Sequence, residues 1–362
     1  MRIAWLMPNL HITGGARAAV ELSNQMIERG HRVSILLPRG RLRLNLDCKA
    51  EVIECGPAVN NPLLAVIVAL ISMPGRIDPN IDLMIASMPP NVIMAHNVCT
   101  RRNIPMINYL MNDDVRFFDD KTYLKSRSLL TLYRYAARQS LRYKHIIANS
   151  HWTAVQCVGN GGLKPSYIVN PGFSPGVFYP DKVKNGANNP IRLVTVGRVT
   201  HWKGFPDLVE ALNILSESRS DFILRIISQD EINISSCRFP AELVKPSNDF
   251  ELAEHYRWGD IFIHSSWFEG FGLPPLEAQA CGVALVSTDS GGVREYLKDR
   301  INSIIVSPRE PHSLSAAIAE LIDNPELRNN LVRNGLESCR EFTWDNVSNK
   351  FEKSLLTILE AV

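Results

Sequence analysis

The chain has 362 residues, more than one compact core usually holds, so its length favours two domains. Hydrophobic residues make up 45% of the sequence and charged residues 21%, which excludes disordered and fibrous proteins. The longest apolar run, Leu63 to Met73, is too short to span a bilayer, and residues 1–8 indicate a strand and loop rather than a signal peptide. Seven scattered cysteines with no CxxC pair imply neither a disulfide framework nor a zinc site, so we expect a cytoplasmic protein.

The net charge of +2 conceals a strong asymmetry. Residues 1–171 carry 20 basic and 11 acidic side chains, a net charge of +9, and the rest of the chain carries a net charge of −7. Opposite signs favour two domains with different partners. The basic half suits an anionic ligand such as a phosphate-bearing acceptor, or an anionic membrane surface. A chance distribution of solvated charges is the alternative.

Short apolar strands alternate with helical segments along the first half of the chain. We expect strands at Arg2–Met7, His31–Leu37, Asp82–Ala86, Met106–Met111 and His145–Ala148, and helices at Arg17–Arg29 and Ser126–Tyr143. This alternation predicts a parallel sheet covered by helices on both faces.

The second half repeats the pattern. We expect strands at Arg192–Val196, Phe222–Ile227, Ile261–His264 and Ala284–Val286, and helices at Phe205–Ser216, Leu276–Ala280, Ser313–Ile322 and Pro325–Phe342. Between the halves, a stretch rich in Pro, Gly and Asn predicts a linker at residues 171–190. The sequence thus predicts an α/β protein with doubly wound domains at 1–170 and 191–343, and a ligand in a cleft beyond the carboxyl ends of the strands.

The first candidate ligand contact is Gly14-Gly15, in the loop after the first strand. Glycine there lets the backbone approach a ligand, and the start of the following helix favours a phosphate. A tight turn explains the same residues. The GxGxxG fingerprint of nicotinamide cofactors is lacking, although Arg39, Arg41 and Arg43 follow the second strand as they would at a 2′-phosphate site.

Arg198 and Lys203 surround the loop after the first strand of the second half. A guanidinium and an ammonium five residues apart can clamp a diphosphate, the Arg as a fork and the Lys as a point charge. Taken alone, the two are equally well explained as solvated charges.

Two carboxylates flank a turn between the strand Ile261–His264 and the next helix. Glu269 precedes the turn, Glu277 lies in the helix, and main-chain N–H groups at the helix start can bind an anion. Carboxylates would repel a phosphate ligand unless they accept hydrogen bonds from its hydroxyl groups. This pattern indicates a ligand with a diphosphate and polyol ends, a nucleotide sugar. The residues of the turn are Gly270, Phe271, Gly272 and Leu273.

Over nearly its whole length the sequence resembles the retaining glycosyltransferases of family four, which have the GT-B fold of two Rossmann-like domains facing across a cleft. The element from Glu269 to Glu277 is the most specific. The other matching segments are Gly14-Gly15, Gly30–Val33, Asn149-Ser150, Val196–Arg198, Lys203-Gly204, Ala280–Gly282, Gly291–Glu295 and Phe342–Trp344. The resemblance implies that residues 344–362 form a helix crossing back to the N-terminal, acceptor-binding domain.

The resemblance also implies roles for single residues. Arg198 and Lys203 would neutralise the donor diphosphate as it leaves, and Gly15 would approach it from the other domain. Glu269 would bind the hydroxyls of the donor sugar, and Glu277 those of the ribose. Phe271, Gly272 and Leu273 would offer main-chain N–H groups. Transfer would be retaining, by a same-face displacement without paired glycosidase-type carboxylates, and would need neither metal nor cofactor.

The chain departs from the family pattern at two places. Where many members carry a His after the strand Met106–Met111, this chain has Asp113 and Asp114, followed by Phe117 and Phe118. Either Asp is a candidate contact with the acceptor. The second departure is Ser228-Gln229-Asp230, which replaces a Gly-rich turn and leaves base recognition, and therefore the nucleotide, open.

A basic helix completes the candidate features. Four arginines lie on one helical face, with tyrosines interleaved, at positions Arg127, Arg134, Arg138 and Arg142. A solvated face is one interpretation, and an acceptor or lipid-headgroup surface is the other. The expected partners are thus a nucleotide sugar, a saccharide or lipid-linked acceptor, and peripherally the anionic inner face of the membrane, with no nucleic acid.

Three function classes remain open. The first is a hexose-transferring glycosyltransferase in cell-surface polysaccharide or glycolipid synthesis. The second is a sugar-nucleotide epimerase of the same fold, and the third is a non-catalytic nucleotide-sugar-binding protein. Asp113-Asp114 could instead form the metal-binding carboxylate pair of the other large transferase fold. The phosphate-binding elements of the second half argue against that last interpretation.

Overall fold

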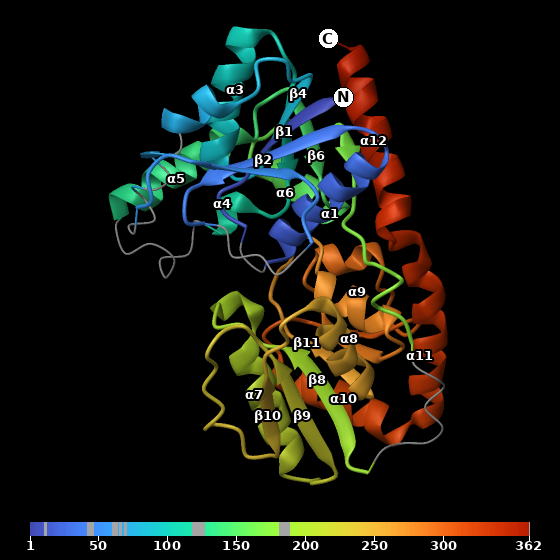
Figure 1. Cartoon of the computed structure of the whole chain (residues 1–362). Coiled ribbons are helices and arrows are strands. Elements are labelled where there is room, and N and C mark those ends of the chain that lie inside the picture. The colour runs from blue at the N-terminus through green and yellow to red at the C-terminus, as the bar shows by residue number, and fades with distance from the viewer. Residues whose placement is uncertain are drawn as a thin grey trace. The chain divides into compact units, whose positions relative to one another are not determined.

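The computed structural model describes residues 1–10, 13–41, 47–59, 64, 67–68, 71–117, 127–180 and 189–361. The chain forms two compact units, shown in Figure 1. Unit 1 comprises Met1–Pro171 together with Trp344–Val362, and unit 2 comprises Gly172–Thr343. The predicted linker lies partly outside the described residues, and so does the apolar run 63–73. Within the described ranges, no helix is long and apolar enough to cross a bilayer.

Unit 1 is built on a parallel sheet of seven strands among the described residues. Their spatial order is β3 (Glu51–Cys55), β2 (Arg32–Pro38), β1 (Arg2–Leu6), β4 (Leu83–Ala86), β5 (Met106–Leu110), β6 (His145–Ala148) and β7 (Tyr167–Ile168). The central strand β1 pairs in parallel with both β2 and β4. The chain order reverses between β1 and β4, which is where open α/β sheets bind ligands at their carboxyl edge.

Helices cover both faces of this sheet. They are α1 (Gly14–Glu28), α3 (Pro89–Arg102), α4 (Asp114–Phe117), α5 (Arg127–Ser140), α6 (His151–Gly159) and α12 (Trp344–Glu360), with the 3₁₀ turn η1 (Met73–Arg76). Ile3 and Trp5 belong to the core that includes α1 and α12, whereas Ala4 and Leu6 belong to the core that includes α3. Successive side chains of a strand point to opposite faces, so a strand buried on both faces is apolar throughout.

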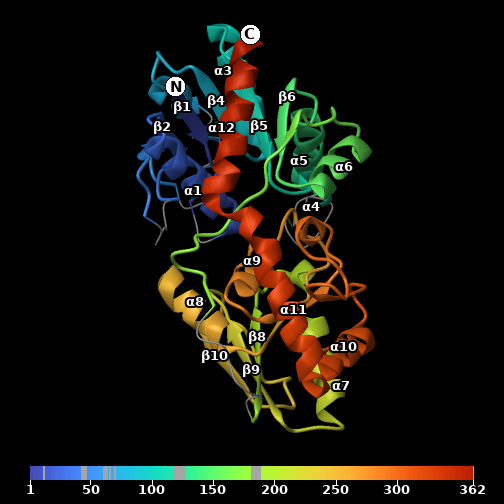
Figure 2. The ribbon, with the colours of Figure 1, turned by 90° about the vertical axis from the view of Figure 1, so that its right-hand side faces the viewer.

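Helix α12 belongs to unit 1 although it lies at the end of the chain (Figure 2). It packs there through an apolar stripe. The stripe recurs at helical spacing and consists of Trp344, Val347, Phe351, Leu355 and Ile358, all buried. The ring of Phe351 is fully buried, with its centroid 5.9 Å from those of both Trp5 and Tyr109. Helix α12 is therefore part of the unit 1 core.

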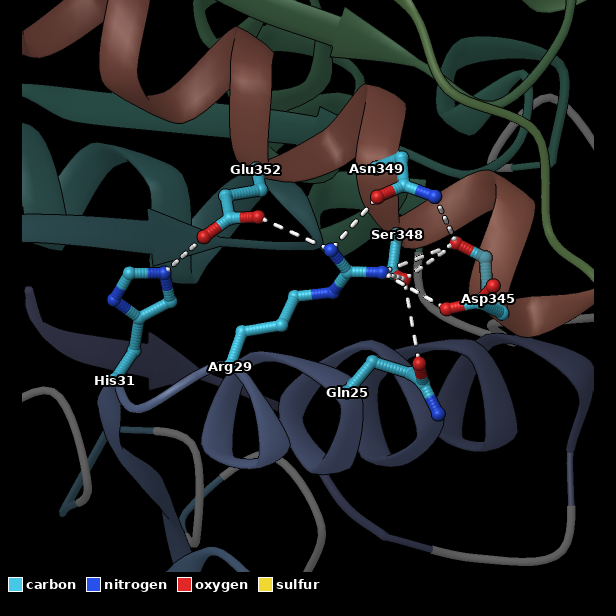
Figure 3. A network of polar contacts seen from close by, with 7 residues as sticks. All are labelled: Gln25, Arg29, His31, Asp345, Ser348, Asn349 and Glu352. Atoms are coloured by element: carbon cyan, nitrogen blue, oxygen red, sulfur yellow. Dashed lines mark hydrogen bonds and ion pairs between the residues drawn. The ribbon is translucent and has the colours of Figure 1, made fainter.

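A polar network fixes α12 against the end of α1 (Figure 3). The guanidinium of Arg29, the residue that caps α1, donates to Asn349 Oδ1 at 2.7 Å and Ser348 Oγ at 2.9 Å. It also pairs with Asp345 Oδ1 at 3.0 Å and Glu352 Oε2 at 3.3 Å. One arginine thus binds residues on successive turns of α12.

His31 extends the same network toward the first residue of the chain. Its Nε2 lies 2.6 Å from Glu352 Oε1, as Figure 3 shows, and its Nδ1 lies 3.0 Å from the amino group of Met1. The network therefore ties the start of β1, the α1–β2 turn and α12 together.

Unit 2 contains a second parallel sheet, of six strands within its described part. Their order is β10 (Ala241–Val244), β9 (Phe222–Ile227), β8 (Ile191–Val196), β11 (Ile261–His264), β12 (Ala284–Thr288) and β13 (Ile304–Val306). The helices are α7 (Phe205–Ser216), α8 (Asp249–Trp258), α9 (Leu273–Ala280), α10 (Pro311–Asp323) and α11 (Pro325–Ser338), with the 3₁₀ turns η2 (His201–Lys203), η3 (Gly292–Glu295) and η4 (Cys339–Phe342). The order reverses between β8 and β11, so the loops after these strands adjoin at the carboxyl edge.

The predicted fold class, α/β with two doubly wound parallel sheets, is confirmed. The strands that the sequence pattern missed are the four at the edges of the two sheets, β3, β7, β10 and β13. The helices α3, α4, α6 and α8 were missed as well. The predicted helix Pro325–Phe342 is instead α11 followed by the tighter turn η4.

Candidate functional site

Two loops of unit 2 are fastened together at the carboxyl edge of its sheet. The Trp267 N–H donates to Trp202 O at 2.7 Å, and Ser265 Oγ donates to Lys203 O at 3.0 Å. Gly204 has a φ of +65°, and a Cβ on it would lie 2.0 Å from Ser265 O. Only glycine fits at that position, so the loop carrying Lys203 is held against the loop carrying Glu269.

Lys203 and Glu269, both predicted site residues, form a two-pronged ion pair. Lys203 Nζ donates to Glu269 Oε1 at 2.7 Å and to Oε2 at 2.9 Å. The Lys203 side chain is 30% exposed and that of Glu269 13%. An ammonium has three N–H donors, so one remains for a ligand after the carboxylate has taken two.

Ser266 and His264 complete the surroundings of Glu269. Ser266 Oγ donates to Glu269 Oε1 at 2.8 Å, and His264 Nε2 lies 4.0 Å from the same oxygen. Burial raises the pKa of the Glu269 carboxyl, but Lys203, His264 and the hydrogen bonds outweigh it, so the pKa is lowered overall. Burial is also the main cause that lowers the pKa of His264, to about 4, so its imidazole is neutral at pH 7. Glu269 is therefore ionised at pH 7 and held in one orientation by Lys203 and Ser266.

The turn after Glu269 lies against the Gly291-Gly292 loop. The Glu269 N–H donates to Ser290 O at 2.8 Å, and the Gly292 N–H donates to Glu269 O at 3.1 Å. A Cβ on Gly292 would lie 2.2 Å from Gly270 O and 2.6 Å from Phe271 N. Gly292 therefore allows two backbone segments to touch, which the sequence alone did not explain.

Helix α9 starts directly after this turn, with Gly272 at φ +88°. The side chains of Phe271 and Leu273 are buried, so what they can offer a ligand is the main chain. Pro274 and Pro275 have no N–H, so Leu273 carries the only main-chain donor among the first three helical residues. The other predicted N–H groups, of Gly270, Phe271 and Gly272, belong to the turn.

Glu277 lies about one turn after Leu273 in α9 and is 3% exposed. Its Oε2 accepts a hydrogen bond from Tyr256 Oη, on α8, at 3.0 Å. Tyr256 was not predicted as part of the site, because its role depends on the contact between α8 and α9. The predicted contact of Glu277 with a ribose stays a prediction.

Arg198 follows β8 and pairs with a residue that sequence reasoning treated only as a departure from the family pattern. Arg198 Nε lies 3.2 Å from Asp230 Oδ2, and the same oxygen accepts the Val199 N–H at 3.1 Å. The Arg198 side chain is 30% exposed and that of Asp230 23%.

In unit 1, the predicted glycines open helix α1. Gly14 is exposed and Gly15 is half-buried, and the preceding Thr13 caps the helix by accepting the Ala16 N–H at 3.3 Å. A Cβ on Gly15 would lie 3.4 Å from Met111 Sδ, just beyond β5. The glycines and the end of β5 therefore adjoin at the carboxyl edge of the sheet.

Asp113 and Asp114 follow Met111 at the same edge, and both are buried. Asp113 accepts the Arg116 N–H at 3.1 Å and Asn160 Nδ2 at 2.9 Å, while burial raises its pKa. Burial, followed by the charge of Asp113, raises the pKa of Asp114 to about 7. Asp114 is thus poised to exchange a proton near neutral pH, whereas Asp113 has a structural role in capping α4.

Other candidate residues contribute less. Arg43, Phe118 and the side chains of Phe117 and Arg127 lie outside the described residues. On α5, Arg138 is exposed and Arg134 is half-buried. Arg142 is exposed but lies in the turn after α5, so the predicted helix ends before it. Among the described residues, no group of three or more His, Cys, Asp or Glu side chains gathers as metal ligands would. Metal independence remains a prediction.

Comparison with known proteins matches both halves of the chain to family models. Residues 12–175 match the model described as Glycosyltransferase Family 4, and residues 180–338 match the model described as Glycosyl transferases group 1. A D-inositol 3-phosphate glycosyltransferase of Geodermatophilus obscurus is 37% identical over 233 residues, covering 55% of this chain and 49% of that protein. One of Thermobispora bispora is 25% identical over 222 residues, covering 54% and 51%. The chain spans about half the length of these curated relatives.

Solved structures share the fold over the whole chain. A sucrose-phosphate synthase from Thermosynechococcus elongatus has a TM-score of 0.84 at 15% identity and covers 100% of both chains. Anabaena Alr3699/HepE in complex with UDP-glucose has a TM-score of 0.77 at 15% identity and covers 99% of this chain and 100% of its own. WaaG, described as a glycosyltransferase involved in lipopolysaccharide biosynthesis, has a TM-score of 0.75 at 15% identity, with 98% and 99% covered.

The two doubly wound sheets, with their loops gathered at the carboxyl edges, define a protein of the GT-B fold. The chain belongs to the group 1 glycosyl transferases of glycosyltransferase family 4. The resemblance inferred from the motifs is therefore confirmed.

Proposed function

We propose that this chain is a retaining glycosyltransferase that moves a sugar from a nucleotide-diphosphate sugar to a hydroxyl acceptor without a metal ion. The single observation that carries the proposal is the Lys203–Glu269 pair, held beside the start of α9. It puts a cation suited to a diphosphate next to a carboxylate suited to sugar hydroxyls. The complexes of HepE with UDP-glucose and with UDP support a donor of this class.

In the proposed reaction the bond between the sugar C1 and the diphosphate oxygen breaks, and a bond from C1 to the acceptor oxygen forms on the same face. The acceptor proton passes to the leaving phosphate oxygen. Arg198, Lys203 and the Leu273 N–H would stabilise the charge that develops on the diphosphate, which is usually the largest catalytic term. Two cationic side chains can supply the charge stabilisation that a divalent metal supplies elsewhere.

Glu269 and Glu277 would read the two polyol ends of the donor. Glu269 Oε1 already accepts from Lys203 and Ser266, whereas Oε2 accepts from Lys203, which leaves lone pairs on Oε2 for a sugar hydroxyl. Glu277, oriented by Tyr256, would bind the ribose. Gly14 and Gly15 would approach the diphosphate from unit 1, and Asp113 or Asp114 would contact the acceptor.

The acceptor and the setting are inferred from the charge of the chain and from its relatives. The net charge of +9 on residues 1–171 suits an anionic acceptor, and the named relatives act on an inositol phosphate. A phosphorylated polyol is therefore the first acceptor to try, followed by saccharide and lipid-linked acceptors. We propose cell-surface polysaccharide or glycolipid assembly, in the cytoplasm or at the inner face of the membrane, as the setting.

Ligand binding and turnover test this proposal in order. Thermal shift against UDP, GDP, ADP and dTDP should raise the melting temperature with at least one of them. With the matching sugar donor, EDTA should leave turnover intact, and NMR should show a product with the donor's anomeric configuration. Donor converted without any acceptor would instead indicate an epimerase, and binding without either reaction a nucleotide-sugar-binding protein.

Two variants test the residues. Lys203→Ala and Glu269→Ala should each lose most of the transfer activity while the fold survives, because each removes a group aimed at the donor. Lys245→Ala and Glu337→Ala are matched controls, since both side chains are exposed and carry the same charges. Near-normal rates in both site variants would overturn the assignment.

A further inference from the structure

Asp230 stands where the family resemblance led us to expect a glycine-rich turn, and it faces Arg198. Asp230 Oδ2 forms an ion pair with Arg198, 3.2 Å from its Nε, and accepts a hydrogen bond from the Val199 N–H at 3.1 Å. Asp230 therefore binds the side chain of Arg198 and the backbone that carries the next residue.

The turn that carries Asp230 is itself fixed. The Ser228 N–H donates to Val244 O at 3.0 Å, and Gln229 Nε2 donates to Pro246 O at 2.7 Å. Ser228 Oγ accepts the Asp230 N–H at 2.9 Å. These bonds join the turn to the end of β10, so Asp230 is a rigid partner for Arg198.

The backbone of Arg198 is fixed from the same side. The Gly197 N–H donates to Ile227 O at 2.9 Å, and a Cβ on Gly197 would lie 2.6 Å from Ile232 Cδ1. With the backbone and Nε both held, the remaining freedom of the guanidinium is small. Within the described part of the chain, no contact occupies its two Nη groups.

A free arginine side chain loses rotamer entropy when it binds a ligand, and this loss weakens binding. A carboxylate that holds Nε removes much of that cost in advance and leaves the Nη edge, a two-pronged donor, for a phosphate. The Asp230 carboxylate also places a negative charge near the proposed diphosphate position, and its ion pair with Arg198 offsets that charge.

We propose that Asp230 is a positioning residue that holds Arg198 in the orientation in which its Nη groups meet the donor diphosphate. This inference rests on the proposed function. The segment Ser228-Gln229-Asp230, which replaces the expected Gly-rich turn, would then serve to bind the donor diphosphate, whether or not it also recognises the base.

A double-mutant cycle on nucleotide affinity tests it. The affinity for UDP, or for whichever of GDP, ADP and dTDP binds best, is measured by calorimetry for wild type, Asp230→Ala, Arg198→Ala and the double variant. Asp230→Ala should weaken binding about tenfold in the wild-type background and less than twofold in the Arg198→Ala background, because Asp230 acts through Arg198. Asp230→Asn, which keeps an acceptor oxygen, should recover part of the loss.

Glu231→Ala is the matched control, since it removes the same charge from the next, exposed residue and should leave affinity unchanged. An equal loss in both backgrounds, or no loss, or tighter binding by Asp230→Ala, overturns the inference while leaving the proposed function standing. If wild type binds none of the four diphosphates, the proposed function fails, and the inference fails with it.

Discussion

Both carboxylate oxygens of Glu269 bind the ammonium of Lys203, at 2.7 and 2.9 Å, although the two residues are 66 positions apart in the chain. Each side chain is largely shielded from water by the loops that follow β8 and β11. The pair neutralises its own charges, which lets an acidic and a basic group lie side by side in the proposed donor site. Separating the pair should therefore have consequences that depend on pH.

Replacing Lys203 by Met should make stability respond to pH in the opposite direction. In wild type the pKa of Glu269 is lowered, so the pair's contribution is present above the unfolded pKa of about 4.3 and is lost as pH falls through the folded value. In Lys203→Met, burial dominates and should raise that pKa, so the variant loses stability as pH rises. At pH 7 we expect the free energy of unfolding of Lys203→Met to be about 2 kcal/mol lower than that of wild type. This loss is smaller than the loss from breaking a fully buried pair.

Chemical unfolding of Lys203→Met at pH 7 and pH 4.5 measures this difference. The deficit relative to wild type should shrink at the lower pH, and Lys245→Met, an exposed lysine, should show no such trend. A deficit independent of pH would mean that the ion pair contributes nothing specific.

Asp114→Asn should stabilise the protein at alkaline pH. Because burial raises the pKa of Asp114 to about 7, the folded state is most stable with the carboxyl protonated. Stability is lost as pH rises from the unfolded pKa of about 3.9 to the folded value, by at most about 4 kcal/mol. Asn removes that penalty, so the gain should be largest at pH 8 and smaller at pH 5.

Melting temperatures of wild type and Asp114→Asn at pH 8 and pH 5 check this expectation. Glu51→Gln is the control, because Glu51 is an exposed carboxylate of the same unit. If Asp114→Asn proves less stable than wild type at pH 8, and by more than at pH 5, the native state favours the ionised carboxyl and the raised pKa of Asp114 is wrong.

Gly292→Ala should disrupt the turn at Gly270–Leu273, where we propose that the donor binds. The added methyl would meet Gly270 O at 2.2 Å and Phe271 N at 2.6 Å, distances that only a displaced backbone can relieve. We expect at least a tenfold loss of nucleoside diphosphate affinity and a lower melting temperature. Gly176→Ala is matched to it, since a Cβ on Gly176, in the same unit, meets nothing within 4 Å. Unchanged affinity in Gly292→Ala would show that the turn takes no part in binding.

Arg29→Met should loosen α12. The guanidinium of Arg29 bonds to several residues of α12 and is only 22% exposed, so its removal should cost about 2 kcal/mol. Hydrogen exchange of the α12 amides should speed up accordingly. Arg32→Met, at an exposed strand position, should leave exchange unchanged, and Glu352→Gln should add little to Arg29→Met because the two share one network. If the stability losses of Arg29→Met and Glu352→Gln add fully in the double variant, the two residues are not coupled.

The fold was predictable because its signal is local. Continuous apolar strands such as β1 and β5 are buried on both faces, and that burial dictates their composition wherever they occur in the chain. The edge strands β3 and β10 are partly exposed, so the apolar run that marks a buried strand is absent from them. The sequence pattern therefore predicts the centre of each sheet better than its edges.

Candidate site residues were predictable as chemical types and not as partners. Spacing indicated that Lys203, Glu269 and Glu277 belong to a phosphate- and polyol-binding region. It could not reveal that Tyr256 binds Glu277 or that Asp230 binds Arg198, because these contacts join elements that only the order of strands and helices brings together.

The sequence by itself therefore determined the alternation of strands and helices, the family, and the kinds of side chain available for a ligand. These properties depend on burial and spacing within single segments. Only the tertiary structure decided which charges neutralise one another, why Gly204 and Gly292 must lack a side chain, and how the pKa of Asp114 differs from that of an exposed Asp. Electrostatics and close packing depend on distances across the fold, and those distances exist only once the sheets have formed.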